Sequence, residues 1–180
     1  MRYYPKIIGE RLYLSPTNAG DEEQYVKWMN DKAVAINFSQ YKVVVASKNE
    51  LKWLFEPGND VHRYAIVLAD GDVMIGSISL HNIDHLNRNA FIGIFIGEEE
   101  HRGKGYGAEA IRLILGFGFN TLNLNNIMLS VDADNIAGIK CYKKVGFSEA
   151  GRRREWKFME GRYVDVLFMD MLAREYKMHE

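Results

Sequence analysis

The chain has 180 residues, 47% of them hydrophobic and 26% charged, so it is long enough to form one domain with a substantial core. A formal net charge of −1 provides no general attraction to nucleic acid or to an anionic membrane, and a single cysteine excludes an internal disulfide. With no apolar run of membrane-spanning length, no signal-peptide core and no histidine spacing typical of a metal site, we expect one cytoplasmic domain over residues 1–180 without membrane, nucleic-acid or metal partners.

Alternating polarity predicts three strands in the first half of the chain, at residues 11–15, 64–69 and 73–80. An Asp-Gly-Asp turn at 70–72 joins the last two strands as a hairpin. Helical periodicity covers residues 17–30, and a capping box at 47–50 opens a second, short helix.

The second half of the chain predicts four more strands, at residues 89–97, 127–132, 156–159 and 163–171. A helical pattern at 108–119 separates the first two of them. Asp134 or Asn135 caps a further helix that ends near Val145, and Gly146 follows as its C-terminal residue. The last two strands flank Gly161 as a second hairpin.

A glycine-rich turn separates the strand at 89–97 from the helix at 108–119, with glycines at Gly103, Gly105 and Gly107. Such a turn exposes backbone N–H groups, the helix start adds a partial positive charge, and missing side chains allow a phosphate to approach. Arg102 and Lys104 add two cations. The sequence therefore predicts a pyrophosphate site.

Spacing discriminates between the known pyrophosphate-binding turns. A P-loop requires a glycine and a Ser or Thr where this chain has Glu98 and Gly105, so that pattern fails. The dinucleotide fingerprint matches through Gly105, Gly107 and Ala110, but its acidic residue about 20 positions on is replaced here by Asn126 and its neighbour. A nicotinamide-dependent oxidoreductase therefore remains a weaker alternative.

Arg102, Gly105 and Gly107 match an arginine-x-x-glycine-x-glycine pattern, and a second block at 130–147 follows in the right order. In both blocks the chain resembles the GNAT N-acetyltransferases, most closely the branch with the ribosomal-protein N-terminal and spermidine acetyltransferases. The resemblance covers roughly residues 9–171. It implies an α/β (α+β) fold with a mixed sheet whose two central strands splay apart, acetyl-CoA as cosubstrate, direct attack by an amine, and the homodimer common among relatives.

The resemblance also implies roles for individual residues. The pyrophosphate is expected to contact Arg102, Gly103, Lys104, Gly105, Tyr106, Gly107 and Ala108. The pantetheine arm is expected to pair with the backbone of Phe95 and Ile96, and Asn135 to contact the cofactor near the thioester. Tyr142 is expected to contact the cofactor and stabilise the leaving thiolate, with a purely structural core tyrosine as the alternative.

The expected general base is where the chain departs from these relatives. Many of them carry a glutamate where this chain has Phe91. His81, Asp84 and His85, in the predicted connection between strands, are candidates to replace it through a water molecule, and solvated loop side chains are the alternative. A non-catalytic acyl-CoA sensor is consistent with the missing carboxylate.

The missing glutamate also suggests an acceptor class. A lysine or polyamine amine with a pKa near ~10.4 costs roughly 4–5 kcal/mol to neutralise at pH 7, whereas an α-amine near ~8 costs about 1.4 kcal/mol. We therefore expect a protein N-terminus, an amino sugar or another small amine of low pKa as acceptor. Tyr25, Trp28 and Phe38 either line its pocket or belong to the core.

Overall fold

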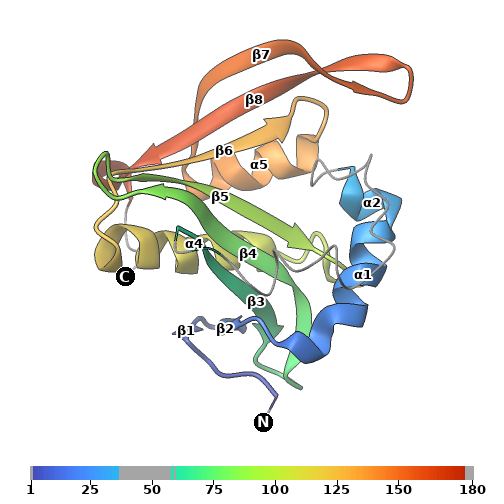
Figure 1. Ribbon diagram of the computed structural model, residues 1–180, viewed down its shortest axis with the longest axis vertical. Coiled ribbons are helices and arrows are strands. Elements are labelled where there is room, and N and C mark those ends of the chain that lie inside the picture. Colours follow the sequence, from blue (N-terminus) through green and yellow to red (C-terminus); the bar gives the residue numbers. More distant parts are fainter. Residues whose placement is uncertain (1, 37–57, 59, 177–180) are drawn as a thin grey trace.

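The computed structural model describes residues 2–36, 58 and 60–176 as a mixed sheet with helices on both faces (Figure 1). The strands are β1 (Ile7–Ile8), β2 (Leu12–Pro16), β3 (His62–Leu68), β4 (Val73–Asp84), β5 (Asn89–Ile96), β6 (Asn126–Asp132), β7 (Ser148–Met159) and β8 (Arg162–Leu172). The α-helices are α1 (Glu22–Asn30), α2 (Lys32–Ala35), α4 (Tyr106–Gly116) and α5 (Ile136–Val145). The capping box predicted at 47–50 lies outside the described residues.

The sheet has the strand order β1-β2-β3-β4-β5-β6-β8-β7, and every neighbouring pair is antiparallel except β5 and β6. These two parallel strands pair only over Asn89–Phe91 and the opposing residues 126–128. Figure 1 shows them side by side at their N-terminal ends and diverging toward their C-terminal ends. The expected α/β fold with splayed central strands is therefore confirmed, and we call the last paired position, Phe91 with Met128, the apex of the gap.

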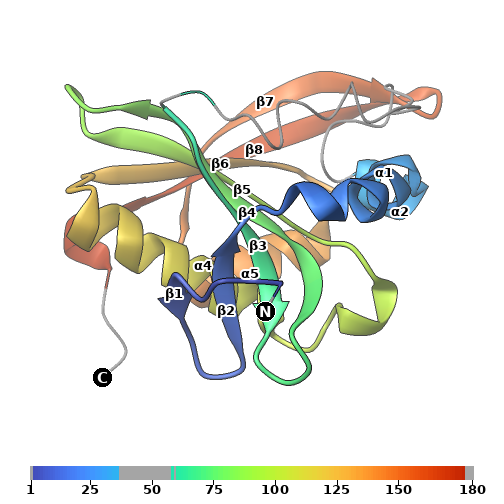
Figure 2. The same cartoon turned by 60° about the horizontal axis from the view of Figure 1, so that its bottom comes forward.

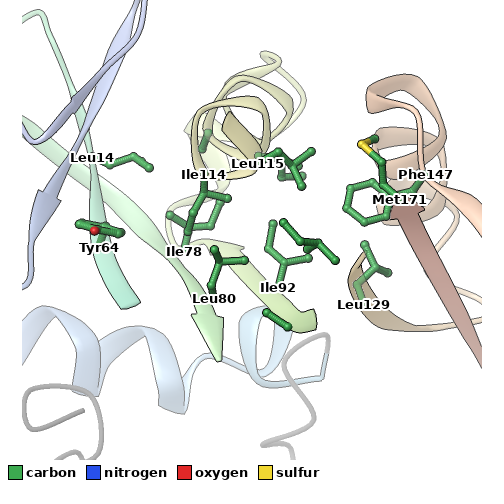
Figure 3. Close-up of a cluster of buried hydrophobic side chains, with 14 of the residues drawn as sticks. Leu14, Tyr64, Ile78, Leu80, Ile92, Ile114, Leu115, Leu129, Phe147 and Met171 are labelled. Carbon is green, nitrogen blue, oxygen red and sulfur yellow. The ribbon is translucent and has the colours of Figure 1, made fainter. Parts of the chain in front are cut away.

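The two faces of the sheet differ in what covers them. Figure 2 shows α4 and α5 on one face and α1 and α2 on the other. On the first face Ile114 and Leu115 of α4 belong to the large buried cluster drawn in Figure 3, together with Ile92 of β5. On the second face Tyr25 and Trp28 of α1 form a smaller buried cluster with Phe95.

Local signals placed several element ends correctly. Gly146 follows α5 with a φ of 116°, and Asn135 is the N-cap, its side chain accepting a hydrogen bond from the N–H of Gly138 at 2.9 Å. Both hairpin turns contain left-handed glycines, Gly71 and Gly161, with φ of 78° and 80°. Positive φ costs a glycine little, which explains why these turns are readable from sequence.

The bounds of several elements differ from the prediction, and β1 and α2 were not predicted. The helix expected at 17–30 starts as the 3-10 turn η1 (Ala19–Asp21), and α1 proper begins at Glu22. β4 extends to Asp84, because it keeps pairing with β5 as far as Asp84 and Asn89. β7 begins at Ser148 instead of residue 156, since a register shift between Arg153 and Lys157 interrupts the alternation that marks a strand.

Candidate active site

The glycine turn, residues 102–107, connects the end of β5 to the start of α4. Gly103 and Gly105 adopt φ of 73° and 84°, in the left-handed region that favours glycine. Gly105 is also the N-cap of α4 and provides no side-chain cap. The first N–H groups of α4 therefore have no acceptor within the helix or from its cap, and they remain available to an anion at the positive end of the helix dipole. This arrangement fits the pyrophosphate of a coenzyme A ester.

Arg102 is bound to the end of β5. Its Nε donates to the carbonyl oxygen of Ile96 at 3.1 Å, and its Nη2 donates to the carbonyl oxygen of Gly97 at 2.5 Å. The Arg102 side chain therefore fastens the turn to the strand that precedes it. Lys104, in contrast, has an exposed side chain.

Arg11, in the turn between β1 and β2, is a part of this site that sequence reasoning missed. Its Nε lies 2.8 Å from Oε2 of Glu109 in α4, and its Nη1 donates to the carbonyl oxygen of Lys104 at 3.0 Å. The guanidinium also lies over the ring of Tyr106, 4.9 Å from the centroid. Arg11 thus braces both the glycine turn and the first turn of α4. No local pattern relates residues so distant in sequence.

The backbone N–H and C=O groups of successive β5 residues point alternately toward β4 and toward β6. The N–H of Gly97 donates to the carbonyl oxygen of Ile75 at 2.9 Å, which directs the peptide groups of Gly97 and Phe95 toward β4. Ile94 and Ile96 therefore direct theirs to the opposite edge, where β6 has diverged. Of the two residues expected to pair with pantetheine, Ile96 faces the gap and Phe95 faces β4.

His81 lies beside the apex, on β4. It is in register with Phe91, and the two rings stack with centroids 6.1 Å apart and planes 30° apart. Its Nδ1 is 3.5 Å from Oγ of Ser79. Burial, followed by the charge of Arg63, lowers the pKa of the His81 imidazole below its usual value, so the ring is neutral at pH 7. The expectation that His81 belongs to a loop between strands is therefore wrong.

The other two candidate bases lie elsewhere. Asp84 is the last residue of β4 and accepts hydrogen bonds from the N–H and Nδ2 of Asn87 at 2.8 and 2.7 Å. These bonds lower the pKa of the Asp84 carboxyl, which marks it as a turn-capping carboxylate. His85 is exposed. Of the three candidate bases, His81 is therefore the one that lies beside the apex.

Tyr142 and Asn135 both belong to α5. Tyr142 is half-buried, and its ring meets that of Phe147 edge-on at 6.1 Å. Burial, with a smaller effect of Cys141, raises the pKa of Tyr142 to about 12, so its hydroxyl stays protonated and able to donate. The Oδ1 of Asn135 accepts the capping hydrogen bond from the N–H of Gly138. The Nδ2 of Asn135 is therefore the donor that can face a ligand.

Several reactive or aromatic side chains near the site have structural roles. Burial raises the pKa of the Cys141 thiol, which disfavours a nucleophilic thiolate. Tyr25 and Trp28 are 0% and 1% exposed, so they form core and do not line a pocket, while Phe38 lies outside the described residues. Glu98 accepts hydrogen bonds from Lys27 and other α1 side chains, which lower its pKa and tie α1 to the glycine turn.

The described residues show neither a membrane-spanning helix nor a cluster of metal ligands. None of their helices has the length and apolar character needed to cross a membrane. Within the same residues, no group of three or more His, Cys, Asp or Glu side chains is arranged to hold a metal ion.

A family model described as the acetyltransferase (GNAT) domain matches residues 11–148. Among curated proteins, an uncharacterized N-acetyltransferase, p20, of Bacillus licheniformis is 29% identical over 174 residues, which is 94% of this chain and 97% of that protein. A putative ribosomal N-acetyltransferase of Bacillus subtilis is 29% identical over 158 residues, covering 76% and 85% of the two chains.

A solved structure resembles this fold over nearly its full length. It is the crystal structure of spermidine N-acetyltransferase from Vibrio cholerae in complex with CoA and spermine. The TM-score is 0.84 at 29% identity, and the match covers 93% of this chain and 98% of that one.

Proposed function

The chain belongs to the GNAT family of acetyltransferases, and from that premise we propose that its acceptor is an amine of low pKa, either a protein N-terminal α-amine or an amino sugar. The enzyme is an acetyl-CoA-dependent N-acetyltransferase, and acetyl-CoA provides the acetyl group as an activated thioester. Neither the nicotinamide alternative nor the sensor alternative is retained.

We assign the pyrophosphate, the pantetheine arm and the thioester of acetyl-CoA to residues at or near the gap between β5 and β6. The uncapped N–H groups of residues 103–108 hold the pyrophosphate, with Lys104 beside them and Arg102 fixing the turn. The N–H of Ile96 and the backbone groups of Ile94 are assigned to the pantetheine arm, since the Ile96 carbonyl already accepts from Arg102. Ile94 takes the role expected for Phe95, because Phe95 faces β4. Asn135 and Tyr142 act at the thioester end, where Tyr142 donates a hydrogen bond to the departing sulfur.

One observation supports the acceptor assignment: the apex holds the stacked rings of Phe91 and His81, at the position where the family resemblance leads us to expect a glutamate. A neutral imidazole of lowered pKa is a weak proton acceptor. Removing the proton costs about 1.4 kcal/mol at pH 7 for an α-amine near pKa ~8 and roughly 4–5 kcal/mol for a polyamine near ~10.4. The apex therefore suits the less basic amine.

Charge on the same face supports this choice. Arg63 of β3 is opposite Ser79 in register, and its charge acts on His81. A polyamine carries several positive charges, which this cation disfavours. An acceptor with a single amine avoids most of this repulsion.

A second candidate is a polyamine, which the similarity to the spermidine N-acetyltransferase of Vibrio cholerae favours. The two proposals are separated by measuring thiol release from acetyl-CoA with a short peptide, glucosamine and spermidine as acceptors. We expect a higher kcat/KM for the peptide or the amino sugar. A clear preference for spermidine would refute the low-pKa proposal and establish the second candidate.

A further inference from the structure

We propose that His81 is the group that accepts the proton of the acceptor amine, replacing from β4 the glutamate that relatives carry at the Phe91 position of β5. The inference rests on the proposed acetyl transfer and concerns its base. Three independent features of the fold support it: the face from which an acceptor reaches the gap, the space beside the imidazole, and the charges around it.

Within the part of the chain that the structure describes, the two faces of the gap differ in how deeply their side chains are buried. On the side of α4 and α5, Ile92 of β5 and Leu129 of β6 are buried in the large core cluster. On the side of α1, Phe91 and Met128 are half-buried and Ser130 is exposed. The His81 ring stacks on Phe91 and therefore lies on this second, accessible face.

Gly93 leaves space next to the imidazole. A Cβ built on Gly93 would lie 3.4 Å from Cε1 of His81 and 3.6 Å from Oγ of Ser79. Because Gly93 has no side chain, the His81 ring and the Ser79 hydroxyl lie close to the β5 backbone between Phe91 and Phe95. An amine bound there lies next to both the His81 ring and the edge of β5 that faces the gap.

The surroundings keep the imidazole neutral at pH 7, the form that can accept a proton. On its own strand the contacting side chain is Ser79, and on β5 the contacting residues are Phe91 and Gly93, which carry no charge. The charged group acting on it from β3 is Arg63, which with burial lowers the pKa of His81. A neutral ring at pH 7 can receive a proton, whereas an imidazolium cannot.

Both protons that the acceptor amine loses can be accounted for with His81 and Tyr142. The acceptor binds as R–NH3⁺ and gives one proton to His81, directly or through one water. The freed amine forms a C–N bond with the acetyl carbonyl carbon as the C–S bond breaks. The second nitrogen proton goes to the CoA thiolate through the hydroxyl of Tyr142, and the His81 imidazolium returns its proton to solvent. No oxidant, reductant or metal is required.

The test compares His81→Gln with a matched control, His62→Gln. His62 of β3 is also half-buried with a pKa lowered by burial, but it lies against Phe117 on the α4 side. With whichever acceptor the wild type uses best, we expect kcat/KM of His81→Gln at pH 7 to fall about 100-fold, the order of general-base catalysis, at unchanged CoA Kd. His62→Gln should retain wild-type kcat/KM. A His81→Gln variant that binds CoA and retains wild-type kcat/KM would overturn the proposal.

A second measurement needs no variant. In the wild type, kcat/KM should rise with pH through a limb whose pKa equals that of His81 measured by NMR, below about 6.5. In His81→Gln this limb should disappear. Absence of the limb at the NMR pKa overturns the proposal even if the variant fails to fold. An enzyme that acetylates only spermidine would refute the acceptor class, yet the same pH profile recorded with spermidine would still decide the role of His81.

Discussion

Arg11 and Glu109, which are 98 positions apart in the chain, form a bidentate contact in which the backbone N–H and Nε of Arg11 each lie 2.8 Å from a Glu109 carboxylate oxygen. This contact connects the first hairpin of the sheet to the helix whose N-terminus is proposed to bind pyrophosphate. The same guanidinium holds the carbonyl of Lys104. The shape of the glycine turn is therefore stabilised from outside the two blocks that resemble the family signature.

Replacing Arg11 by Ala should weaken CoA binding about fivefold to tenfold, because one partly exposed charge-assisted contact is worth about 1 kcal/mol. Isothermal titration calorimetry measures the effect. Arg88→Ala is the control, since Arg88 binds Asn123 at the opposite end of the sheet. Equal CoA Kd values for Arg11→Ala and wild type would show that Arg11 does not contribute to CoA binding.

Gly105→Ala should both destabilise the protein and weaken CoA binding. Its φ of 84° costs an L-residue about 1–2 kcal/mol, and its new Cβ would lie 3.4 Å from Nη2 of Arg11. Gly161→Ala provides the matched control, with a φ of 80° in the β7–β8 turn and open space around it. Both variants should lower the melting temperature, and only Gly105→Ala should raise the CoA Kd.

Tyr142→Phe should lower kcat roughly 10- to 100-fold with little change in CoA Kd, because the hydroxyl is proposed to donate a hydrogen bond to the departing sulfur. Since the pKa of Tyr142 is raised to about 12, its hydroxyl remains protonated throughout the usual assay range. No alkaline loss of activity should therefore originate from this group below about pH 10. Tyr176→Phe, at the far end of the sheet, is the control; a variant Tyr142→Phe that binds CoA poorly but keeps kcat would assign the residue a structural role.

Phe91→Glu should raise the ratio of kcat/KM for spermidine to kcat/KM for an N-terminal peptide by about tenfold, because a carboxylate at the apex adds a second proton acceptor and a negative charge that attracts a polycation. Phe91→Gln has a similar shape without the charge, and its ratio should stay near that of the wild type. The two variants are compared by thiol release under identical conditions. An unchanged ratio in Phe91→Glu would show that the apex does not select the acceptor.

Sequence signals worked best for features that depend on a few consecutive residues. The glycine turn, the cap at Asn135 and the end of α5 at Gly146 follow from backbone preferences, which neighbouring residues largely determine. Strand ends were less predictable. β4 was expected to stop before His81, and its extension became visible only when its pairing with β5 was known.

The sequence by itself thus determined the class of fold, the glycine turn before α4 and the family signature, because hydrophobic period and glycine placement act locally. Only the tertiary structure decided which distant side chains make contact, namely Arg11 with Glu109 and His81 with Phe91. It also decided that the backbone groups of Ile94 point to the edge of β5 from which β6 diverges. The physical reason is register. A slip of one residue turns a strand side chain to the opposite face, and no local pattern encodes the pairing of distant strands with that accuracy.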